Sequence, residues 1–137
     1  SSFSKSSVVF KDGSKESYDY VMYATGYKIT FPFLDQSIAD YENNDVDLYN
    51  LCFHPDINNL MFVGLIQPLG CIWPLSDLQS QLIAKYLKGE WELPIDLQRA
   101  IKNQKENKSF DFIDTPRHKL EVDYHDFAAH LKKEIQA

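Results

Sequence analysis

The sequence predicts an α/β fold in which a β-hairpin and short buried strands are followed by helices. Two short β-prone runs, residues 7–10 and 15–18, flank an Asp-Gly turn, which is a strong hairpin signal. Two short apolar runs, residues 20–24 and 60–65, are each followed by a segment that carries glycine. Apolar residues recur at helical spacing in the second half of the chain.

The run at residues 20–24 is expected to form an interior parallel strand, because it is short, β-prone and closed by small residues. Residues 29–34 are aromatic and interrupted by a proline, which indicates a packed loop. Residues 35–47 are acidic with few large apolar groups, so they predict a solvated loop. Residues 48–53 are a further candidate strand, which ends at a His-Pro pair.

The stretch from residue 60 to residue 81 reads as a buried strand, a loop punctuated by proline and glycine, and a helix. Ser76 and Gln79 form an S-x-x-Q capping box, which predicts that the helix begins at Ser76. Asp77 would then stabilise the helix dipole from the first turn, and Gly89 would end the helix. The predicted apolar face comprises Leu75, Leu78, Leu82, Ile83, Tyr86 and Leu87.

Two more helices are predicted toward the end of the chain. Residues 95–107 carry a narrow apolar stripe, so this helix is expected to lie on a surface. Residues 124–135 follow Asp123, a predicted N-cap, and residues 110–117 read as a loop. The predicted inward residues are Leu97, Ala100 and Ile101 in the first helix and Phe127, Ala128, Leu131 and Ile135 in the second.

Composition narrows the function classes. The chain has 137 residues, 14 basic and 20 acidic, for a net charge of -6, and no basic stripe, which argues against nucleic acid as a partner. Its longest apolar run, residues 60–66, is far shorter than the roughly 20 residues of a membrane span. No membrane anchor is therefore expected in this segment, and without a signal peptide the expected location is the cytoplasm.

Metal and thiol chemistry are not predicted. Cys52 and Cys71 are too far apart for a CxxC motif and are expected to be buried and inert. His125 and His130 are five residues apart, which places them on different faces of a helix and argues against a zinc pair. Trp73 lies inside the predicted loop and is therefore a better functional candidate than the other tryptophan, Trp91.

Two segments favour a functional interpretation. Residues 24–27 and residues 64–74 each follow a predicted buried strand and combine glycine with small or apolar residues. A strand that leads through a glycine loop into a helix N-terminus commonly meets a cofactor in α/β proteins. The pair predicts two faces of one cofactor cleft.

These residues resemble the flavin-containing monooxygenases. The resemblance runs in order along almost the whole chain, and ATGY and GLIQPLG together are quite specific. The matching stretches are VFKDGSKE (9–16), YDYVMYATGY (18–27), FPFL (31–34), FVGLIQPLG (62–70), DLQ (77–79), RH (117–118) and VDY (122–124).

The resemblance implies an enzyme of two dinucleotide-binding domains. Such an enzyme uses NADPH to reduce FAD, forms a C4a-hydroperoxyflavin with O2 and oxygenates nitrogen or sulfur nucleophiles, so small amines or sulfides are the implied substrates. Residues 1–27 would be the end of the NADPH-domain hairpin with its linker strand, and residues 28–137 the C-terminal part of the FAD-binding domain. Thr25, Gly26, Gln67 and Gly70 would be the cofactor-binding residues, while the catalytic residues stay unknown.

The chain also departs from the family pattern. The family's two Rossmann glycine motifs and its FxGxxxHxxx(Y/F) signature are absent, and no Gly-x-Gly occurs among the five glycines. The expectation is therefore a C-terminal fragment that lacks an N-terminal portion, does not bind FAD or NADPH tightly and is inactive alone. An apolar surface left by the absent part would favour self-association.

Two alternatives stay open on the sequence. One is another two-domain flavoprotein, such as a Baeyer–Villiger monooxygenase; a disulfide reductase would need a redox-active cysteine pair that Cys52 and Cys71 do not supply. The other is a cofactor-free interaction module that kept half of a flavoprotein fold.

Overall fold

The computed structural model describes residues 2–4, 7–26, 29–35, 38, 47–107 and 119–137. Most of the predicted loop at residues 35–47 and all of the one at 110–117 lie outside these residues. The elements are β1 (Ser2–Ser4), β2 (Ser7–Val9), β3 (Lys15–Ser17), β4 (Gln67–Pro68), α1 (Trp73–Leu87), α2 (Leu97–Glu106), β5 (Glu121–Val122) and α3 (Tyr124–Gln136).

The predicted hairpin is confirmed as β2 and β3, which pair antiparallel with Val8 opposite Glu16. The sequence analysis did not predict β1, which pairs antiparallel with β2 to complete a three-stranded sheet. Asp12 fixes the turn because its carboxylate accepts hydrogen bonds from the Ser14 hydroxyl (2.7 Å) and the Ser14 amide (3.0 Å). The hydroxyl bond, followed by the amide bond, lowers the pKa of the Asp12 carboxyl.

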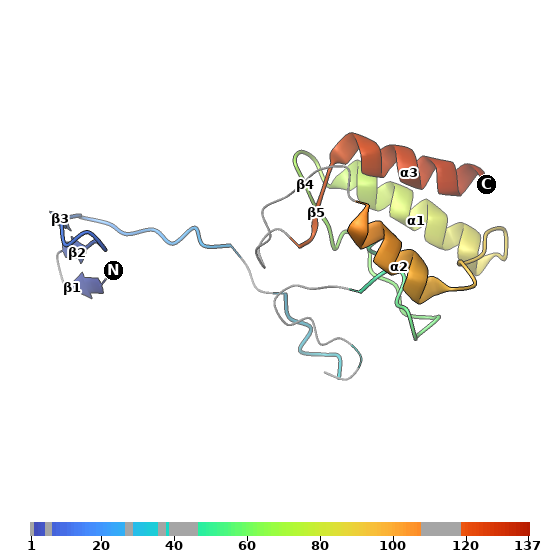
Figure 1. Cartoon of the computed structure of the whole chain (residues 1–137), viewed down its shortest axis with the longest axis horizontal. Helices are drawn as coiled ribbons and strands as arrows, with labels where there is room; N and C mark the ends of the chain where they lie inside the picture. The colour runs from blue at the N-terminus through green and yellow to red at the C-terminus, as the bar shows by residue number, and fades with distance from the viewer. Residues whose placement is uncertain (1, 5–6, 27–28, 36–37, 39–46, 108–118) are drawn as a thin grey trace.

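The prediction of a buried strand at residues 20–24 is wrong. These residues run in an extended conformation but join no β-ladder, and Tyr20 and Met22 are each 92% exposed. Figure 1 shows this light-blue segment leading from the small sheet toward the helical part. An interior strand needs a ladder partner on each side, and the described residues place none beside this run.

The predicted strands at residues 48–53 and 60–65 are also wrong. Asn50 (φ 52°) and Leu51 (φ 51°) are left-handed, and they fold the first segment into a tight turn. Only isolated bridges remain, between Tyr49 and Phe53 and between Phe53 and Met61. These bonds close a compact loop, so short apolar runs that look like strands serve here as core turns.

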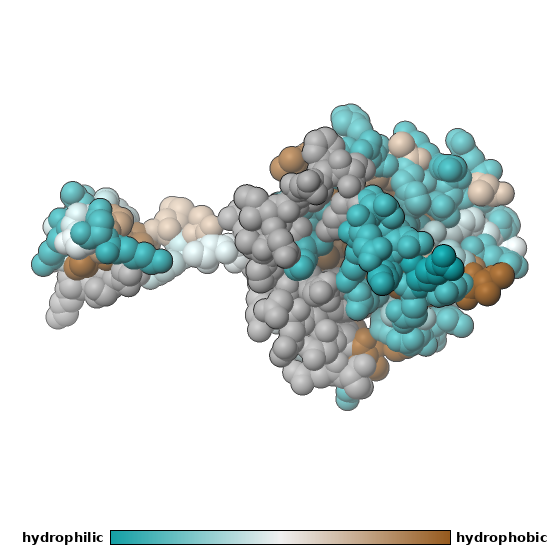
Figure 2. Space-filling model, in the orientation of Figure 1, coloured by the Kyte–Doolittle hydropathy of each residue, from teal (hydrophilic) through white to brown (hydrophobic). Residues whose placement is uncertain are grey.

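The core lies among the three helices and this compact loop. α1 packs along α3, and α2 lies near them in Figure 1. The apolar stripe of α2 packs on the core cluster. Trp91 stacks on Tyr49 with ring centroids 6.3 Å apart, which confirms it as a packing anchor. The buried cluster comprises Tyr49, Cys52, Phe53, Leu82, Trp91, Ile101 and Leu131. Figure 2 shows a mostly hydrophilic face over the helices with separate apolar groups on it.

The helices are confirmed, but the start of α1 was predicted wrongly. α1 begins at Trp73, three residues before Ser76, because Pro74 at the start of the helix has a φ angle preset for it. It ends as predicted at Gly89 (φ +69°), where the amide of Gly89 bonds to Tyr86 O and that of Glu90 to Lys85 O, a Schellman motif.

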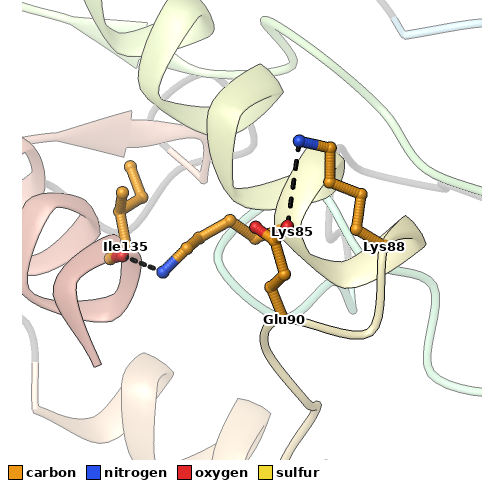
Figure 3. Close-up of polar contacts among 4 residues, drawn as sticks. All are labelled: Lys85, Lys88, Glu90 and Ile135. Carbon is orange, nitrogen blue, oxygen red and sulfur yellow. Dashed lines mark hydrogen bonds and ion pairs between the residues drawn. The ribbon is translucent and has the colours of Figure 1, made fainter.

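The other helix ends match their sequence signals closely. Asp123 caps α3 by accepting from the Asp126 amide, as predicted. Asp96 caps α2 by accepting from the Arg99 amide, so α2 begins slightly later than expected. Polar contacts reinforce the C-terminal end of α1: Lys85 donates to the carbonyl of Ile135 in α3, and Lys88 pairs with Glu90 (Figure 3).

Within the described ranges, the fold is thus a small α/β arrangement of two short sheets and three helices. The second sheet is a parallel pair, β4 with β5, in which Gln67 lies opposite Glu121. It joins the loop before α1 to the residues before α3 and was not predicted. None of the helices within the described residues is long and apolar enough to cross a membrane.

Candidate functional site

The glycine loop, residues 64–72, leads into the N-terminus of α1 and holds two predicted cofactor-binding residues. Gln67 lies in β4 with its side chain exposed, and its backbone amide donates to Leu120 O (2.8 Å). Gly70 (φ +138°) is also exposed, and a Cβ there would meet only the ring of Tyr124, at 4.0 Å. Gln67 and Gly70 therefore face outward on a loop that the parallel pair holds in place.

The positive N-terminus of α1 is not neutralised by its N-cap side chain or by its first turn. The N-cap residue Ile72 provides no side-chain hydrogen bond, and the first turn contains no acidic residue. Trp73, the first residue of the helix, is 76% exposed. Asp77 lies beyond the first turn and accepts a hydrogen bond from Gln81 (2.8 Å), so its predicted role as a first-turn dipole partner is wrong. An anionic group at this end would meet the positive end of the dipole without a competing carboxylate in the first turn of the helix.

Ser76 and Gln79 do not form the predicted capping box. The Ser76 hydroxyl donates back to Ile72 O (3.2 Å), within the helix. Gln79 is fully buried: its Oε1 accepts from the Gly64 amide (2.9 Å). Its Nε2 donates to Asn50 O (3.0 Å) and to Leu51 O (3.3 Å). The S-x-x-Q pair is thus bonded to both ends of the glycine loop.

The other two predicted cofactor-binding residues, Thr25 and Gly26, lie in the exposed extended segment. Gly26 is left-handed (φ +83°) with open space where a Cβ would be. Gln67 and Gly70 share one loop, whereas no contact described for the chain joins them to Thr25 or Gly26. That the two segments form one cleft stays a prediction.

A partly buried polar cluster of Asn50, Gln104 and His130 lies next to the glycine loop and was not predicted. The backbone amide of Asn50 donates to Gln104 Oε1 (3.0 Å), and the side-chain oxygen Asn50 Oδ1 accepts from Gln104 Nε2 (2.6 Å). His130 Nε2 lies 2.8 Å from the same Asn50 oxygen. The cluster joins the left-handed turn to α2 and α3. No local sequence pattern predicts this cluster, because its members lie up to 80 positions apart in the sequence.

Among the described residues, the cysteines and histidines form no cluster that could hold a metal ion. Cys52 is buried as predicted, and burial raises the pKa of its thiol, which keeps it protonated. Cys71 is exposed, so its predicted burial is wrong: it precedes the N-cap on the outer side of the glycine loop. His54 is a loop residue as predicted, with Nδ1 accepting from the amides of Asp56 and Ile57 (both 3.1 Å).

Comparison with known proteins decides the family. The family model described as "Flavin-binding monooxygenase-like" matches residues 1–137. The chain belongs to this family.

Individual flavin-containing monooxygenases match at similar levels. "Flavin-containing monooxygenase 5" of Mus musculus is 38% identical over 129 residues, which is 90% of this chain and 24% of the relative. "Flavin-containing monooxygenase 2" of Homo sapiens is 38% identical over 138 residues, 97% of this chain and 26% of the relative. "Dimethylaniline monooxygenase [N-oxide-forming] 2" of Pan troglodytes shows the same figures as the human protein. The chain spans about a quarter of the length of the curated relatives it matches.

Proposed function

We propose that this chain is the C-terminal portion of an FAD- and NADPH-dependent monooxygenase that oxygenates nitrogen or sulfur nucleophiles. The family match along all 137 residues carries the proposal. The name of the chimpanzee relative, which specifies N-oxide formation, supports amine nitrogen as the target. When bound, the flavin supplies the activated oxygen that is transferred to the substrate.

The glycine loop and the N-terminus of α1 fit one edge of a flavin. A reduced flavin is anionic at its N1/O2 edge, and the uncapped helix start, free of first-turn acids, suits that charge. The exposed side-chain amide of Gln67 can donate to ring atoms, and the bare backbone of Gly70 permits close approach. Leu69 and Trp73 are exposed beside them and would exclude water once covered by a ligand or a neighbouring domain.

The same proposal assigns residues 1–27 to the end of an NADPH domain and its linker, and residues 28–137 to an FAD domain. The small sheet stands apart from the helices, with the extended segment between them, which supports this division. The phosphates of both cofactors would be held by glycine motifs outside this chain, because its five glycines form no Gly-x-Gly. The 137-residue chain alone is therefore expected neither to retain flavin nor to turn over.

Two samples test the proposal: the natural full-length gene product and the 137-residue chain alone. The full-length protein should purify with a flavin band near ~450 nm and should convert dimethylaniline to its N-oxide with NADPH and O2, followed by mass spectrometry. The chain alone should show neither. A full-length protein without flavin would overturn the proposal. Lactone or ester formation from ketones without N-oxidation would instead favour a Baeyer–Villiger enzyme.

A further inference from the structure

We propose that Ser76 and Gln79 hold the two ends of the glycine loop, and that Gln79 is a positioning residue for flavin binding. The loop-holding role stands on the contacts of this chain alone. The link to flavin rests on the proposed function, because it takes the glycine loop as a wall of the flavin site. Gln79 itself is buried and touches no cofactor.

Gln79 holds the first end of the loop. Its side chain is fully buried, and each hydrogen of its amide and one oxygen lone pair have a backbone partner. The oxygen fixes the amide of Gly64, three residues before β4. A single buried side chain with three bonds to two separate loops specifies their relative position, because each bond restricts a different backbone group.

Ser76 lies one turn before Gln79 on the same face of α1 and is next to both ends of the loop. Its hydroxyl and its amide both bond to Ile72 O, at 3.2 and 3.0 Å. A Cβ placed on Gly64 would lie 3.1 Å from the same hydroxyl oxygen and 3.9 Å from Ile72 Cδ1. Gly64 and Ile72, the first and last residues of the glycine loop, therefore both lie against Ser76 of α1. The seven residues between them, 65–71, form an arch whose two ends are held together there.

The left-handed turn gives the arch a fixed base. The two carbonyls that accept from Gln79 belong to Asn50 and Leu51, both at positive φ. Left-handed non-glycine residues are costly and persist only where their surroundings hold them. Gln104 and His130 hold Asn50 from the far side. The arch is thus linked through Gln79 to α2 and α3, not to α1 alone.

The experiment uses the full-length, flavin-loaded protein and its apoprotein. Gln79→Met removes all three bonds at nearly constant volume, and Gln81→Met makes the same change at an exposed position on the same helix. Hydrogen exchange by mass spectrometry of the apoprotein should show faster exchange at Gly64 by about tenfold in Gln79→Met, the loss of one hydrogen bond, and less than about twofold in Gln81→Met.

Flavin binding is the second readout. Gln79→Met should weaken flavin binding about fivefold or more and broaden the visible flavin band, while Gln81→Met should match the wild type. Unchanged exchange at Gly64 in Gln79→Met would overturn the loop-holding role. Faster exchange with unchanged flavin affinity and spectrum would overturn the positioning role. A wild-type protein that takes up no flavin would overturn the proposed function together with the positioning role, while the exchange result would still decide the loop-holding role.

A measurement without mutation covers the case in which Gln79→Met does not fold. In the wild-type protein the Gly64 amide, bonded to a buried side chain, should exchange at least about tenfold more slowly than the exposed Gly70 amide. Equal rates at the two glycines would overturn the loop-holding role.

Discussion

Gly64 needs to be glycine for two separate reasons. Its φ of +76° is a left-handed conformation that costs other residues about 1–2 kcal/mol. A Cβ would also lie 3.1 Å from Ser76 Oγ, closer than ordinary van der Waals contact. We therefore expect Gly64→Ala to lower the free energy of unfolding by about 2–3 kcal/mol, measured by urea denaturation.

Gly89 provides the matched control for that change. Its φ of +69° is similar, but nothing lies within 4 Å of the added Cβ, so Gly89→Ala should cost only about 1–2 kcal/mol. Removing the Ser76 hydroxyl in a Gly64→Ala/Ser76→Ala double variant should recover part of the difference. Equal costs at the two glycines would show that the contact with Ser76 does not matter.

Tyr49 gives the core a dependence on alkaline pH. Burial, and after it the negative charge of Glu134, raise the pKa of Tyr49 to about 12. Because the folded pKa exceeds the unfolded value near 10, this group stabilises the fold fully below pH 10, and that contribution is lost as the pH rises toward 12. We expect unfolding midpoints to fall over this range and Tyr49→Phe to flatten the fall. A decline of the same slope in Tyr49→Phe would assign it to other groups.

At the scale of single elements, two aspartates near helix starts differ in how much they should contribute to the stability of the fold. Asp123 accepts a hydrogen bond from the Asp126 amide at the start of α3, whereas Asp77 lies inside α1 and bonds only to Gln81. Asp123→Ala should therefore destabilise the chain by about 1 kcal/mol in thermal or urea unfolding. Asp77→Ala should change it by less than about 0.5 kcal/mol. The reverse order would restore the helix-dipole role that the sequence predicts for Asp77.

The elements also show how far local signals reach. The Asp-Gly hairpin, the Gly89 stop and the Asp123 cap were predicted because each depends on residues within a few positions. The S-x-x-Q pair misled because its letters fit both a capping box and a buried contact to a distant loop. Pro74 was the stronger signal for the start of the helix.

At the scale of the whole molecule, α1 and α3 each contribute a buried leucine to the core. Leu82 and Leu131 are both fully buried there, whereas Leu87 at the end of α1 is 69% exposed. Leu82→Ala and Leu131→Ala should each lower the free energy of unfolding by about 2–5 kcal/mol. Leu87→Ala should cost less than about 0.5 kcal/mol. Similar losses at all three positions in chemical denaturation would contradict the packing of α1 on α3.

The short apolar runs were the main failure of prediction, for a physical reason. Residues 20–24, 48–53 and 60–65 have strand-like composition, but a strand exists only where a neighbour completes its ladder. The described chain places the first run in no β-ladder and folds the other two into a turn and a single bridge. Alternating or short apolar patterns indicate which residues prefer to be buried, but they do not identify the neighbouring strand that would pair with them.

The sequence by itself determined the family, the hairpin, the three helices and the loop that the cofactor proposal depends on, because these depend on local spacing and on letters that a family shares. Only the tertiary structure decided what Gln79 does. Its amide bonds to Gly64, 15 positions away, and to Asn50, 29 positions away, and no local pattern encodes such contacts. The left-handed turn at residues 50–51 is likewise held by distant residues, because Gln79, Gln104 and His130 bond to it from three directions along the chain.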